Sequence, residues 1–532
     1  MKIVTAAQMV SLEQASARRG VSTDTLMENA GLAVALAARE RLATVAGARV
    51  VVLVGPGNNG ADGLVAARHL QRWGAEVTAY VVGRRPDPDP KMDRALEYRL
   101  RVCRAPSEDP HLDQLDRLLE RCRLVIDAML GTGSARPLEG LPREVIQRVN
   151  ATRARERRPL LLALDLPTGV NGDTGAVDPA GLVADVTVAL GFPKGGLLTF
   201  PGAGHVGQLQ VVDIGLPAGL AEERDIDLEM LTPDWARTHL PPRPLDSHKG
   251  TFGHLLVVAG SRNYVGAACL AAQAAVRAGA GLVTLASPRS VYSIAAAKLT
   301  EVIHLPLPED DQGRVHPEAA QVLGDRLPRY NSLAVGSGLG WSSGTTEFLS
   351  RLLTPGPAAP VPTVIDADGL NNLSGLPNWW QRLPGPTVIT PHPGEMSTLT
   401  GRSTAEVQRD RVQSARSWAA KWGVTVVLKG ANTVVAQPGG TVRVSPFANP
   451  GLASGGTGDV LTGTIGGLLA QGLAPHDAAG CAVYLHARAG AKAVERRGNT
   501  GTVASDLIDL LPETIDQLRR GSGASGGRPI FA

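Results

Sequence analysis

Short apolar runs recur along the first half of the chain and alternate with segments that have a helical period. The run RVVVLV at residues 49–54 is apolar at every position after Arg49, which is typical of a strand covered on both faces of a parallel sheet. A glycine-rich loop and a helix to about Trp73 follow it, and residues 76–82 form the next run. Similar strands are predicted at residues 124–128, 160–164, 184–190 and 208–212. This pattern indicates a doubly wound parallel α/β sheet.

The same alternation starts again in the second half. Residues 218–245 hold several prolines and mixed charges without a clear period, so we assign them to a linker. Strands are then predicted at residues 254–259, 282–286, 333–335, 363–365, 387–389 and 424–428, with a hairpin at 432–444 and long helices after Asp459 and Pro475. The chain is therefore predicted to have one domain at residues 1–217, a second at 246–518, and a disordered glycine- and serine-rich tail at 519–532.

Composition narrows the class of protein. Of the 532 residues, 43% are hydrophobic, enough for large cores, and 53 basic residues against 50 acidic ones leave a charge of +3. This balance argues against nucleic acid or an anionic membrane as the main partner. The four cysteines have no C-x-x-C spacing, so neither a disulfide framework nor a metal cluster is expected. Because we find no signal-peptide core and no membrane-spanning stretch, we expect a soluble, cytoplasmic protein.

The loop after the first predicted strand, GPGNNGADG at residues 55–63, contains the pattern G-x-G-x-x-G. Glycines at this spacing let a pyrophosphate approach the backbone N–H groups at a helix N-terminus, so a nucleotide-bearing ligand is expected. Asn58, Asn59 and Asp62 are unusual in a dehydrogenase loop, and VGRR at residues 82–85 lacks the acidic ribose partner. An NADP-dependent dehydrogenase and a tight turn without ligand remain alternatives. Arg84 and Arg85 would favour a ligand with a 2′-phosphate.

Two further strand ends carry polar residues. DAMLGTG at residues 127–133 ends one predicted strand, and DLPTG at residues 165–169 ends another. In an open α/β sheet, ligands bind outside the carboxyl ends of the strands, so these loops are expected to converge on the glycine-rich loop. Asp127 or Asp165 taken alone could equally be a helix cap.

Together with LMENAG at residues 26–31, these segments resemble the NAD(P)HX epimerase domain, which has a Rossmann-like fold. The resemblance implies that K⁺ is held by Asn59, Asp127 and Thr168, whose oxygen atoms suit a hard cation. It also implies the residues that contact the damaged dinucleotide: Asn58, Asn59, Gly60, Ala61, Asp62, Gly131, Thr132, Gly133, Ser134, Ala135, Arg136, Pro137 and Asp165. The chain departs from the family pattern at Ala61, usually Gly, and at Thr168, often Ser.

The implied substrate is a reduced nicotinamide hydrated at C6. Loss of the hydroxyl gives a cation stabilised by the ring nitrogen, and water can return from either face. The reaction needs a positioned acid/base, a role that we assign to Asp165.

The most specific string in the chain is NPGLASGGTGDVLTG at residues 449–463. We expect backbone N–H groups of Gly456, Thr457 and Gly458 to form an anion hole for a phosphoryl group at the start of a helix. Asp459 is then placed to accept the proton of an attacking hydroxyl. The sequence has no GxxxxGK[ST] motif, so this is not a P-loop enzyme. A glycine-rich packing segment with a capping Asp is the alternative.

This string resembles the ribokinase-like superfamily, and five other motifs narrow the resemblance to the ADP-dependent NAD(P)HX dehydratase. They are HKGTFGH (248–254), GSRNYVGA (260–267), DADGLN (366–371), TPHPGE (390–395) and KGANT (429–433). The resemblance implies contacts to the hydrate from Ala267, Gly338, His392 and Asp459, and to ADP from Lys429, Gly430, Ala431, Asn432, Thr433 and Gly458. It implies phosphorylation of the C6 hydroxyl by ADP with Mg²⁺, followed by elimination of phosphate.

Taken together, the chain resembles the bifunctional NAD(P)H-hydrate repair enzymes. The resemblance implies two α/β domains, one Rossmann-like and one ribokinase-like, that act on NADHX and NADPHX. The first would interconvert the R and S epimers, and the second would use ADP to dehydrate the S epimer, releasing AMP and phosphate. It also implies a homo-oligomer. Two alternatives stay open: a small-molecule kinase fused to a regulatory domain, and a first half that binds a dinucleotide or protein without catalysis.

Overall fold

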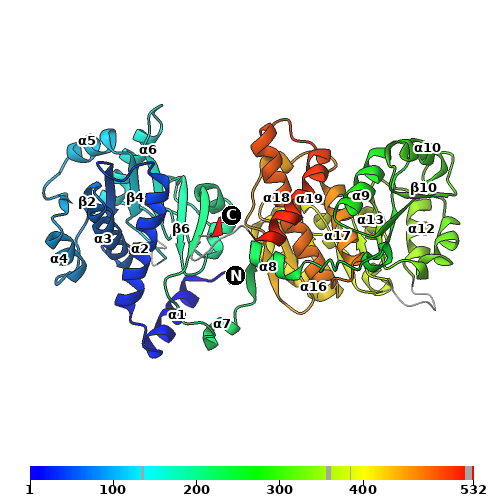
Figure 1. Ribbon diagram of the computed structural model, residues 1–532, viewed down its shortest axis with the longest axis horizontal. Helices are drawn as coiled ribbons and strands as arrows, with labels where there is room; N and C mark the ends of the chain where they lie inside the picture. Colours follow the sequence, from blue (N-terminus) through cyan, green and yellow to red (C-terminus); the bar gives the residue numbers. More distant parts are fainter. Residues whose placement is uncertain (133–136, 355–360, 384, 522–529, 532) are drawn as a thin grey trace. The chain divides into compact units, whose positions relative to one another are not determined.

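The computed structural model describes residues 1–132, 137–354, 361–383, 385–521 and 530–531. The chain forms two compact units (Figure 1), Met1–Leu228 together with the end of the chain (unit 1) and Glu229–Ser525 (unit 2). The units divide inside the predicted linker, residues 218–245. That segment is not devoid of structure: it contains α7 (Ala221–Arg224), β8 (Leu228–Met230) and α8 (Pro233–His239).

The prolines that suggested a linker have a local explanation at α8. Pro233 occupies the first turn of this helix, where the missing N–H costs nothing, and the Thr232 side chain caps the helix by accepting a hydrogen bond from Trp235 N. In the predicted tail, residues 519–532, α19 reaches Arg520 and Ile530–Phe531 form β18. Residues 522–529 and 532 lie outside the described residues.

The sheet of unit 1 has the strand order β18-β7-β6-β5-β4-β1-β2-β3. Its parallel strands are β1 (Arg49–Val54), β2 (Glu76–Val82), β3 (Arg101–Ala105), β4 (Leu124–Ala128), β5 (Leu160–Leu164), β6 (Val186–Leu190) and β7 (Gln208–Val212). β18 (Ile530–Phe531) adds an antiparallel edge next to β7. The chain turns from one half of the sheet to the other between β1 and β4, the point at which doubly wound sheets bind ligands.

Helices cover both faces of this sheet, as the uninterrupted apolar run predicted. Val50, Val52 and Val54 of β1 belong to a core shared with α1 (Ala6–Arg18), α2 (Thr23–Arg41), α3 (Asn58–Arg72) and α4 (Pro90–Glu97). Val51 and Leu53 point to the opposite core, under α5 (Asp113–Arg121) and α6 (Gly140–Arg153). Strand β1 is therefore buried along nearly its whole length, with its carboxyl end opening into the glycine-rich loop.

The sheet of unit 2 has the order β11-β10-β9-β12-β13-β14-β15-β16-β17-β8. Its strands are β9 (His254–Val258), β10 (Leu282–Pro288), β11 (Ile303–Leu307), β12 (Ser332–Val335), β13 (Thr363–Ile365), β14 (Thr387–Ile389), β15 (Thr425–Leu428), β16 (Val434–Ala436) and β17 (Val442–Val444). The strands from β11 to β15 are parallel, and β16 and β17 form the predicted antiparallel hairpin. This architecture is the one expected from the resemblance to the ribokinase-like superfamily.

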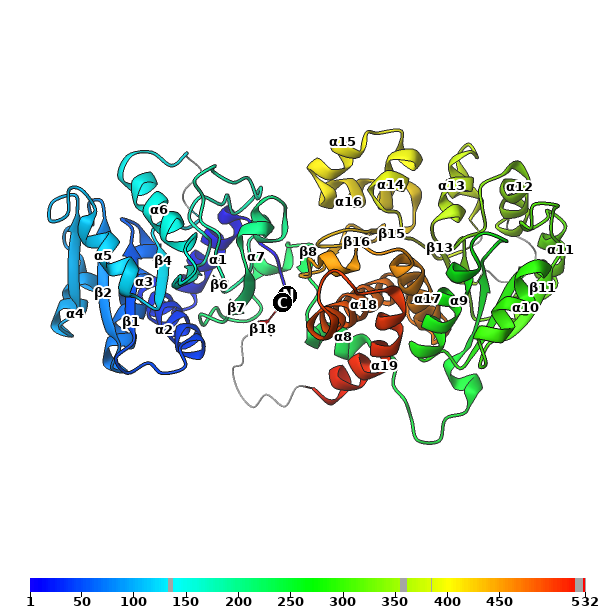
Figure 2. The same ribbon diagram turned by 90° about the horizontal axis from the view of Figure 1, so that it is seen from above.

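In Figure 2, α17 (Thr457–Ala470), α18 (Pro475–Arg497) and α19 (Ala504–Arg520) lie on one side of this sheet and α14 (Pro393–Thr400), α15 (Thr404–Arg409) and α16 (Arg411–Trp422) on the other. The remaining α-helices are α9 (Val265–Arg277), α10 (Arg289–Lys298), α11 (Ala319–Gly324), α12 (Ser343–Leu352) and α13 (Asp368–Ser374). Short 3₁₀ helices occur at Gly195–Leu198, Gly202–His205, Lys249–Phe252, Leu327–Arg329, Trp379–Arg382 and Pro450–Leu452.

Helix α17 is rich in glycine because it packs closely on two sides. A Cβ at Gly463 would lie 2.0 Å from the carbonyl oxygen of Ala271 in α9, and one at Gly466 would meet Leu255 and Ala334 of the sheet. This close packing fixes the N-terminus of α17 relative to the strand ends. Among the described residues, no helix is long and apolar enough to cross a lipid bilayer.

Candidate active sites

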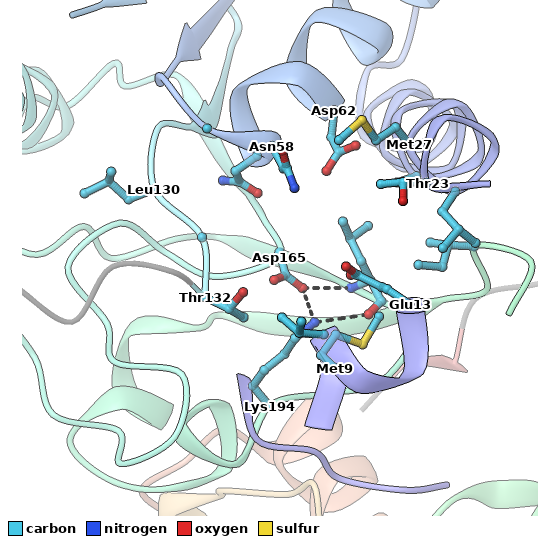
Figure 3. Close-up of a pocket in the computed structure, with 18 of the residues that line it drawn as sticks. Met9, Glu13, Thr23, Met27, Asn58, Asp62, Leu130, Thr132, Asp165 and Lys194 are labelled. Carbon is cyan, nitrogen blue, oxygen red and sulfur yellow. Dashed lines mark hydrogen bonds and ion pairs between the residues drawn. The ribbon is translucent and has the colours of Figure 1, made fainter. Parts of the chain in front are cut away.

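A cavity of about 780 Å³ opens at the carboxyl ends of β1, β4 and β5 in unit 1 (Figure 3). The three predicted loops do converge here. The predicted residues that line the cavity are Asn58, Asn59, Asp62, Gly131, Thr132 and Asp165. Residues from α1 and α2, among them Met9, Glu13 and Met27, close its remaining walls. The cavity is large enough for part of a dinucleotide.

Other predicted contact residues are placed differently. A Cβ at Gly60 would lie 2.1 Å from the carbonyl oxygen of Gly55, so this glycine lets α3 start close to the strand end. Ala61 is buried within α3. Pro137 lines a neighbouring cavity of about 310 Å³ that also touches Gly131. The predicted contacts Gly133, Ser134, Ala135 and Arg136 lie outside the described residues.

The start of α3 borders the cavity, and no side chain among the described residues caps its first backbone N–H groups. Gly57 occupies the N-cap position and has no side chain to cap these groups. Arg85 braces this loop: its Nη1 donates to the carbonyl oxygens of Gly55 at 2.8 Å and Gly57 at 3.1 Å, and its Nε pairs with Asp89 at 2.7 Å. Arg85 therefore holds the loop in place.

Asp165 lies in the cavity with a buried partner that sequence analysis missed. Its Oδ1 accepts hydrogen bonds from Lys194 Nζ at 2.5 Å and from Leu190 N at 3.1 Å. Lys194 is only 1% exposed and also donates to the Leu190 carbonyl oxygen at 3.1 Å. Asp165 itself adopts a left-handed backbone conformation, with φ of 67°, a strained arrangement that is common at functional sites.

The carboxyl groups of Asp62 and Glu13 line the same cavity as this ion pair. Burial raises the pKa of Asp62 well above its usual value, and the nearby Asp165 and Glu13 raise it further. Burial also raises the pKa of Glu13, against the attraction of Lys194. The cavity therefore brings three carboxyl groups to one lysine, and like charges at short range favour keeping a proton on one of them.

The residues predicted to hold K⁺ lie beside the cavity. Asp127 is fully buried and accepts hydrogen bonds from Thr168 Oγ1 and from Thr168 N, both at 2.7 Å. Burial raises the pKa of the Asp127 carboxyl to about 6. Asn59 is also buried: its side chain packs against Gly131, and its Nδ2 has no hydrogen-bond partner in the described part of the chain. The oxygen atoms of these three buried side chains are of the kind that a hard monovalent cation takes.

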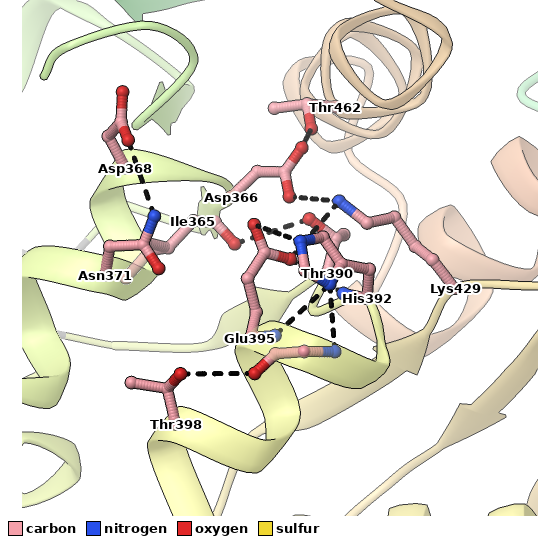
Figure 4. Close-up of polar contacts among 11 residues, drawn as sticks. Ile365, Asp366, Asp368, Asn371, Thr390, His392, Glu395, Thr398, Lys429 and Thr462 are labelled. Atoms are coloured by element: carbon pink, nitrogen blue, oxygen red, sulfur yellow. Dashed lines mark hydrogen bonds and ion pairs between the residues drawn. The ribbon is translucent and has the colours of Figure 1, made fainter. Parts of the chain in front are cut away.

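In unit 2, polar residues follow three adjacent parallel strands (Figure 4). Lys429, after β15, places its Nζ 2.6 Å from Oδ1 of Asp366, after β13, and 3.7 Å from Oε2 of Glu395 in α14. The other Asp366 oxygen accepts a 2.6 Å hydrogen bond from Thr462 of α17. This network ties the strand ends to the helix that begins at the predicted anion hole.

The N-terminus of α17 meets this network. Gly456 is its N-cap in a left-handed conformation, with φ of 89°. A Cβ at Gly458 would lie 3.5 Å from Lys429 Nζ, so the predicted anion hole is next to a cation. The Thr457 hydroxyl donates to the carbonyl oxygens of Leu452 and Ser454 and shapes the loop. The Thr457 N–H also donates to the Ser454 carbonyl oxygen, at 3.4 Å, so the N–H groups of Gly456 and Gly458 remain as the anion donors.

Asp459 lies in the first turn of α17, as predicted. Burial raises the pKa of its carboxyl to about 6, and the neighbouring Asp366 contributes to the rise while Lys429 opposes it. A carboxyl group with this pKa is ionised at neutral pH and can still accept a proton effectively, as a general base must.

His392 caps α14. Its Nδ1 accepts hydrogen bonds from Gly394 N at 3.0 Å and Glu395 N at 3.2 Å, and Glu395 accepts one from His392 N at 2.7 Å. The side chain is 56% exposed, so the ring is accessible at the strand ends. His392 thus has a structural role besides its predicted contact to the hydrate.

The remaining predicted residues fall into two groups. Gly338 and Ala267 are neighbours, since a Cβ at Gly338 would lie 3.0 Å from that of Ala267. In KGANT, Asn432 is buried and donates to the Ser445 carbonyl oxygen at 3.0 Å, and Thr433 donates to the Gly430 carbonyl oxygen at 2.8 Å. The Asn432 side chain therefore supports the hairpin. Ala431 has no polar side-chain atom with which to bind a nucleotide.

Sequence analysis gave no role to several residues that the structure places at these sites: Glu13, Lys194, Asp366, Glu395 and Thr462. Asp366 and Glu395 do stand in the quoted motifs. Lys194 carries a weaker signal, because it is a lone lysine shortly after an apolar strand.

Comparisons with known proteins find a different family in each of the two units. A family model described as NAD(P)H-hydrate dehydratase matches residues 255–513, and one described as YjeF-related protein N-terminus matches residues 23–196. Among solved structures, the ADP/ATP-dependent NAD(P)H-hydrate dehydratase from Bacillus subtilis, co-crystallised with ATP and Mg²⁺, is 31% identical. It covers 55% of this chain and 99% of its own, with a TM-score of 0.48.

Two curated proteins match nearly the whole chain. The bifunctional NAD(P)H-hydrate repair enzyme of Moorella thermoacetica is 41% identical over 523 residues, covering 97% of both chains. The protein of the same name from Thermofilum pendens is 37% identical and covers 98% of this chain and 97% of its own. The chain therefore belongs to the family of bifunctional NAD(P)H-hydrate repair enzymes.

Proposed function

We propose that this protein repairs hydrated NADH and NADPH in two steps. Unit 1 interconverts the R and S epimers of NAD(P)HX, and unit 2 dehydrates the S epimer at the expense of ADP, releasing AMP and phosphate. The observation that carries this proposal is the meeting of Asp459, the N-terminus of α17 and Lys429 at one end of the sheet, where a phosphoryl group can be received. Family membership over nearly the whole chain supports both steps.

In unit 1, the dinucleotide binds with its phosphates at the start of α3 and its hydrated ring in the cavity beside Asp165. Departure of the C6 hydroxyl leaves a cation that the ring nitrogen stabilises. Asp165 acts in acid/base catalysis, and the apolar side chains of Met9, Leu26 and Met27 exclude bulk water.

Asn59, Asp127 and Thr168 would hold K⁺ beside this cavity, where the ion supplies positive charge near the dinucleotide. The backbone N–H of Thr168 donates to Asp127, which fixes the segment from β5 next to the end of β4. Through this contact Asp127 and Thr168 order the loops that surround the substrate.

In unit 2, Asp459 takes the proton of the C6 hydroxyl as the terminal phosphoryl group of ADP is transferred to that oxygen. Backbone N–H groups of Gly456 and Gly458 and the ammonium of Lys429 stabilise the charge that develops on the phosphoryl oxygens. The ring nitrogen then expels phosphate, and loss of a proton from C5 to water forms the C5–C6 double bond. We assign the contacts to ADP to residues 429–433 and Gly458, and those to the hydrate to Ala267, Gly338, His392 and Asp459.

Mg²⁺ would neutralise the nucleotide phosphates. Among the described residues there is no cluster of three Asp, Glu, His or Cys side chains that could hold a metal. The carboxylates of Asp366 and Glu395 both face Lys429. The ion would therefore be held mainly by phosphate oxygens and water, an arrangement that suits Mg²⁺. We also propose a homo-oligomer.

The test is the recovery of reduced-nicotinamide absorbance from a mixture of both epimers, with ADP, ATP or no nucleotide. Full recovery that requires a nucleotide and is lost in Asp459→Ala would support the dehydratase. Recovery of only part of the mixture at the fast rate in Asp165→Ala would support the epimerase. No recovery with either nucleotide would refute both, and a stable phosphorylated product would indicate a kinase.

A further inference from the structure

Two carboxyl groups enter the cavity of unit 1 from different walls (Figure 3). Asp62 projects from α3, and Asp165 projects from the residue that follows β5. The surroundings of these two side chains differ in charge and in hydrogen bonding, and this difference suits them to different chemical roles.

Asp165 is an ion-pair partner. Lys194 Nζ and Leu190 N both donate to its Oδ1, and the buried Lys194 is itself fixed by the Leu190 carbonyl oxygen. In the described part of the chain no donor is assigned to Oδ2. Because both donors bind Oδ1, Oδ2 is the oxygen that can take a proton, and the ion pair with Lys194 suits Asp165 to the role of base rather than acid.

Asp62 has the opposite environment. It is 7% exposed, and its Oδ1 has no hydrogen-bond partner among the described residues. The charged groups that face it are Asp165, Glu13, Lys91 and Lys194; beyond the dominant effect of burial, the carboxylates raise its pKa and the lysines lower it, with a net rise. A buried carboxyl group without its own cation is stable in the neutral form, and a neutral carboxyl group can donate a proton.

Resting on the proposed epimerase function, we propose that Asp62 is the acid and Asp165 the base of the epimerisation, acting on opposite faces of the nicotinamide ring. Asp62 gives its proton to the C6 hydroxyl, the C6–O bond breaks, and water leaves with the bonding electrons. A water molecule on the other face forms the new C6–O bond and passes its extra proton to Asp165. Proton transfer from Asp165 to Asp62 through water restores the starting state.

Lys194 is a positioning residue in this scheme, because it orients Asp165 and leaves Oδ2 to act. The scheme explains why an epimerase needs two carboxyl groups: inversion requires departure from one face and addition from the other. If Asp165 alone served as both acid and base, Asp62 would only bind the substrate.

The first experiment compares the full-length wild type with Asp62→Asn, Asp165→Asn, Glu13→Gln and Asp93→Asn, starting from one purified epimer. We expect Asp62→Asn and Asp165→Asn each to lower kcat of epimerisation by about 10²–10⁴-fold, and Asp93→Asn, on the exposed face of α4, to have no effect. Because the acid must be protonated, the wild-type rate should fall at high pH. Asp62→Asn should remove this fall. Urea unfolding of unit 1, in which all four substitutions lie, reports that each variant is folded.

The second experiment needs no variant. In ¹⁸O-water, opposite-face addition places a solvent oxygen in every epimerised molecule, which mass spectrometry detects. Retention of the original oxygen would overturn the proposal, as would an Asp62→Asn variant changed only in KM, or a high-pH limb lost in Glu13→Gln instead. A wild type that epimerises no faster than the spontaneous reaction would refute the proposed function itself, not the division of roles.

Discussion

The ammonium of Lys429 lies 2.6 Å from Oδ1 of Asp366, and the side chain of Asp366 is only 2% exposed. Burial would lower the pKa of Lys429, but the attraction of Asp366 and Glu395 outweighs it and the net shift is upward. The lysine therefore remains charged beside the N-terminus of α17, where it can serve the phosphates of a nucleotide.

Replacing this lysine should affect both stability and nucleotide use. Lys429→Met leaves Asp366 and Glu395 buried without their cation, so we expect the free energy of unfolding of unit 2 to fall by about 3–5 kcal/mol and KM for ADP to rise. Urea unfolding and initial rates measure the two effects. The control is Arg351→Met in the exposed pair with Glu347, where a loss above about 1 kcal/mol would argue against the role of burial.

The dehydratase should lose activity in acid. Because the folded-state pKa of Asp459 is raised to about 6, its carboxyl is protonated below that pH and cannot accept the hydroxyl proton. We expect kcat/KM to fall about tenfold per pH unit below pH 6. Asp459→Asn should lose about 10²–10⁴-fold in kcat and show no such limb, while epimerisation is unchanged. A wild-type profile that stays flat to pH 5 would contradict the assignment.

Unit 1 should become less stable at low pH because Glu28 loses its charge there. Burial alone would raise its pKa, but hydrogen bonds from Arg68 and Lys91 lower it to about 2. A depressed pKa means that the stabilisation is complete above the unfolded value of 4.5 and is lost as pH falls towards 2. We expect Glu28→Gln to cost about 1–3 kcal/mol at pH 7 and close to nothing at pH 2, measured by urea unfolding. An equal cost at both pH values would show that charge is not the cause.

Close packing of α17 predicts a sharp difference between two glycines. Gly463→Ala would place a methyl group against the Ala271 carbonyl oxygen, and we expect a loss of at least about 1–3 kcal/mol together with reduced dehydration. Gly266, in α9, has open space around a Cβ, so Gly266→Ala should stabilise unit 2 by about 0.5–1 kcal/mol. Thermal unfolding distinguishes them, and similar melting temperatures would contradict the packing argument.

The proposed potassium site predicts a cation dependence. Epimerisation should be faster in potassium chloride than in N-methylglucamine chloride at equal ionic strength. Thr168→Ser keeps the hydroxyl and should keep this dependence, whereas Thr168→Val removes the oxygen and should abolish it. Initial rates of epimerisation decide the matter, and a rate that is independent of the cation in the wild type would exclude the site.

Several elements could be predicted from the sequence because their signals are local. The run at residues 49–54 is apolar at every position after the first because β1 is covered on both faces, and G-x-G-x-x-G follows it because α3 must start close to the strand. Asp459 was placed correctly at the start of α17 for the same reason. Strands β3 and β11 were not predicted, because they lie at or near sheet edges and mix polar with apolar residues.

The partners of the catalytic groups depend on the tertiary structure. Lys194 and Asp165 are 29 residues apart, and Lys429 and Asp366 are 63 residues apart, so no local pattern relates them. Periodicity along the chain records which residues are buried and which turns need glycine. Which buried charges meet is decided by the order in which the strands assemble, because that order sets which loops share an edge of the sheet and so which lysine neutralises which carboxylate.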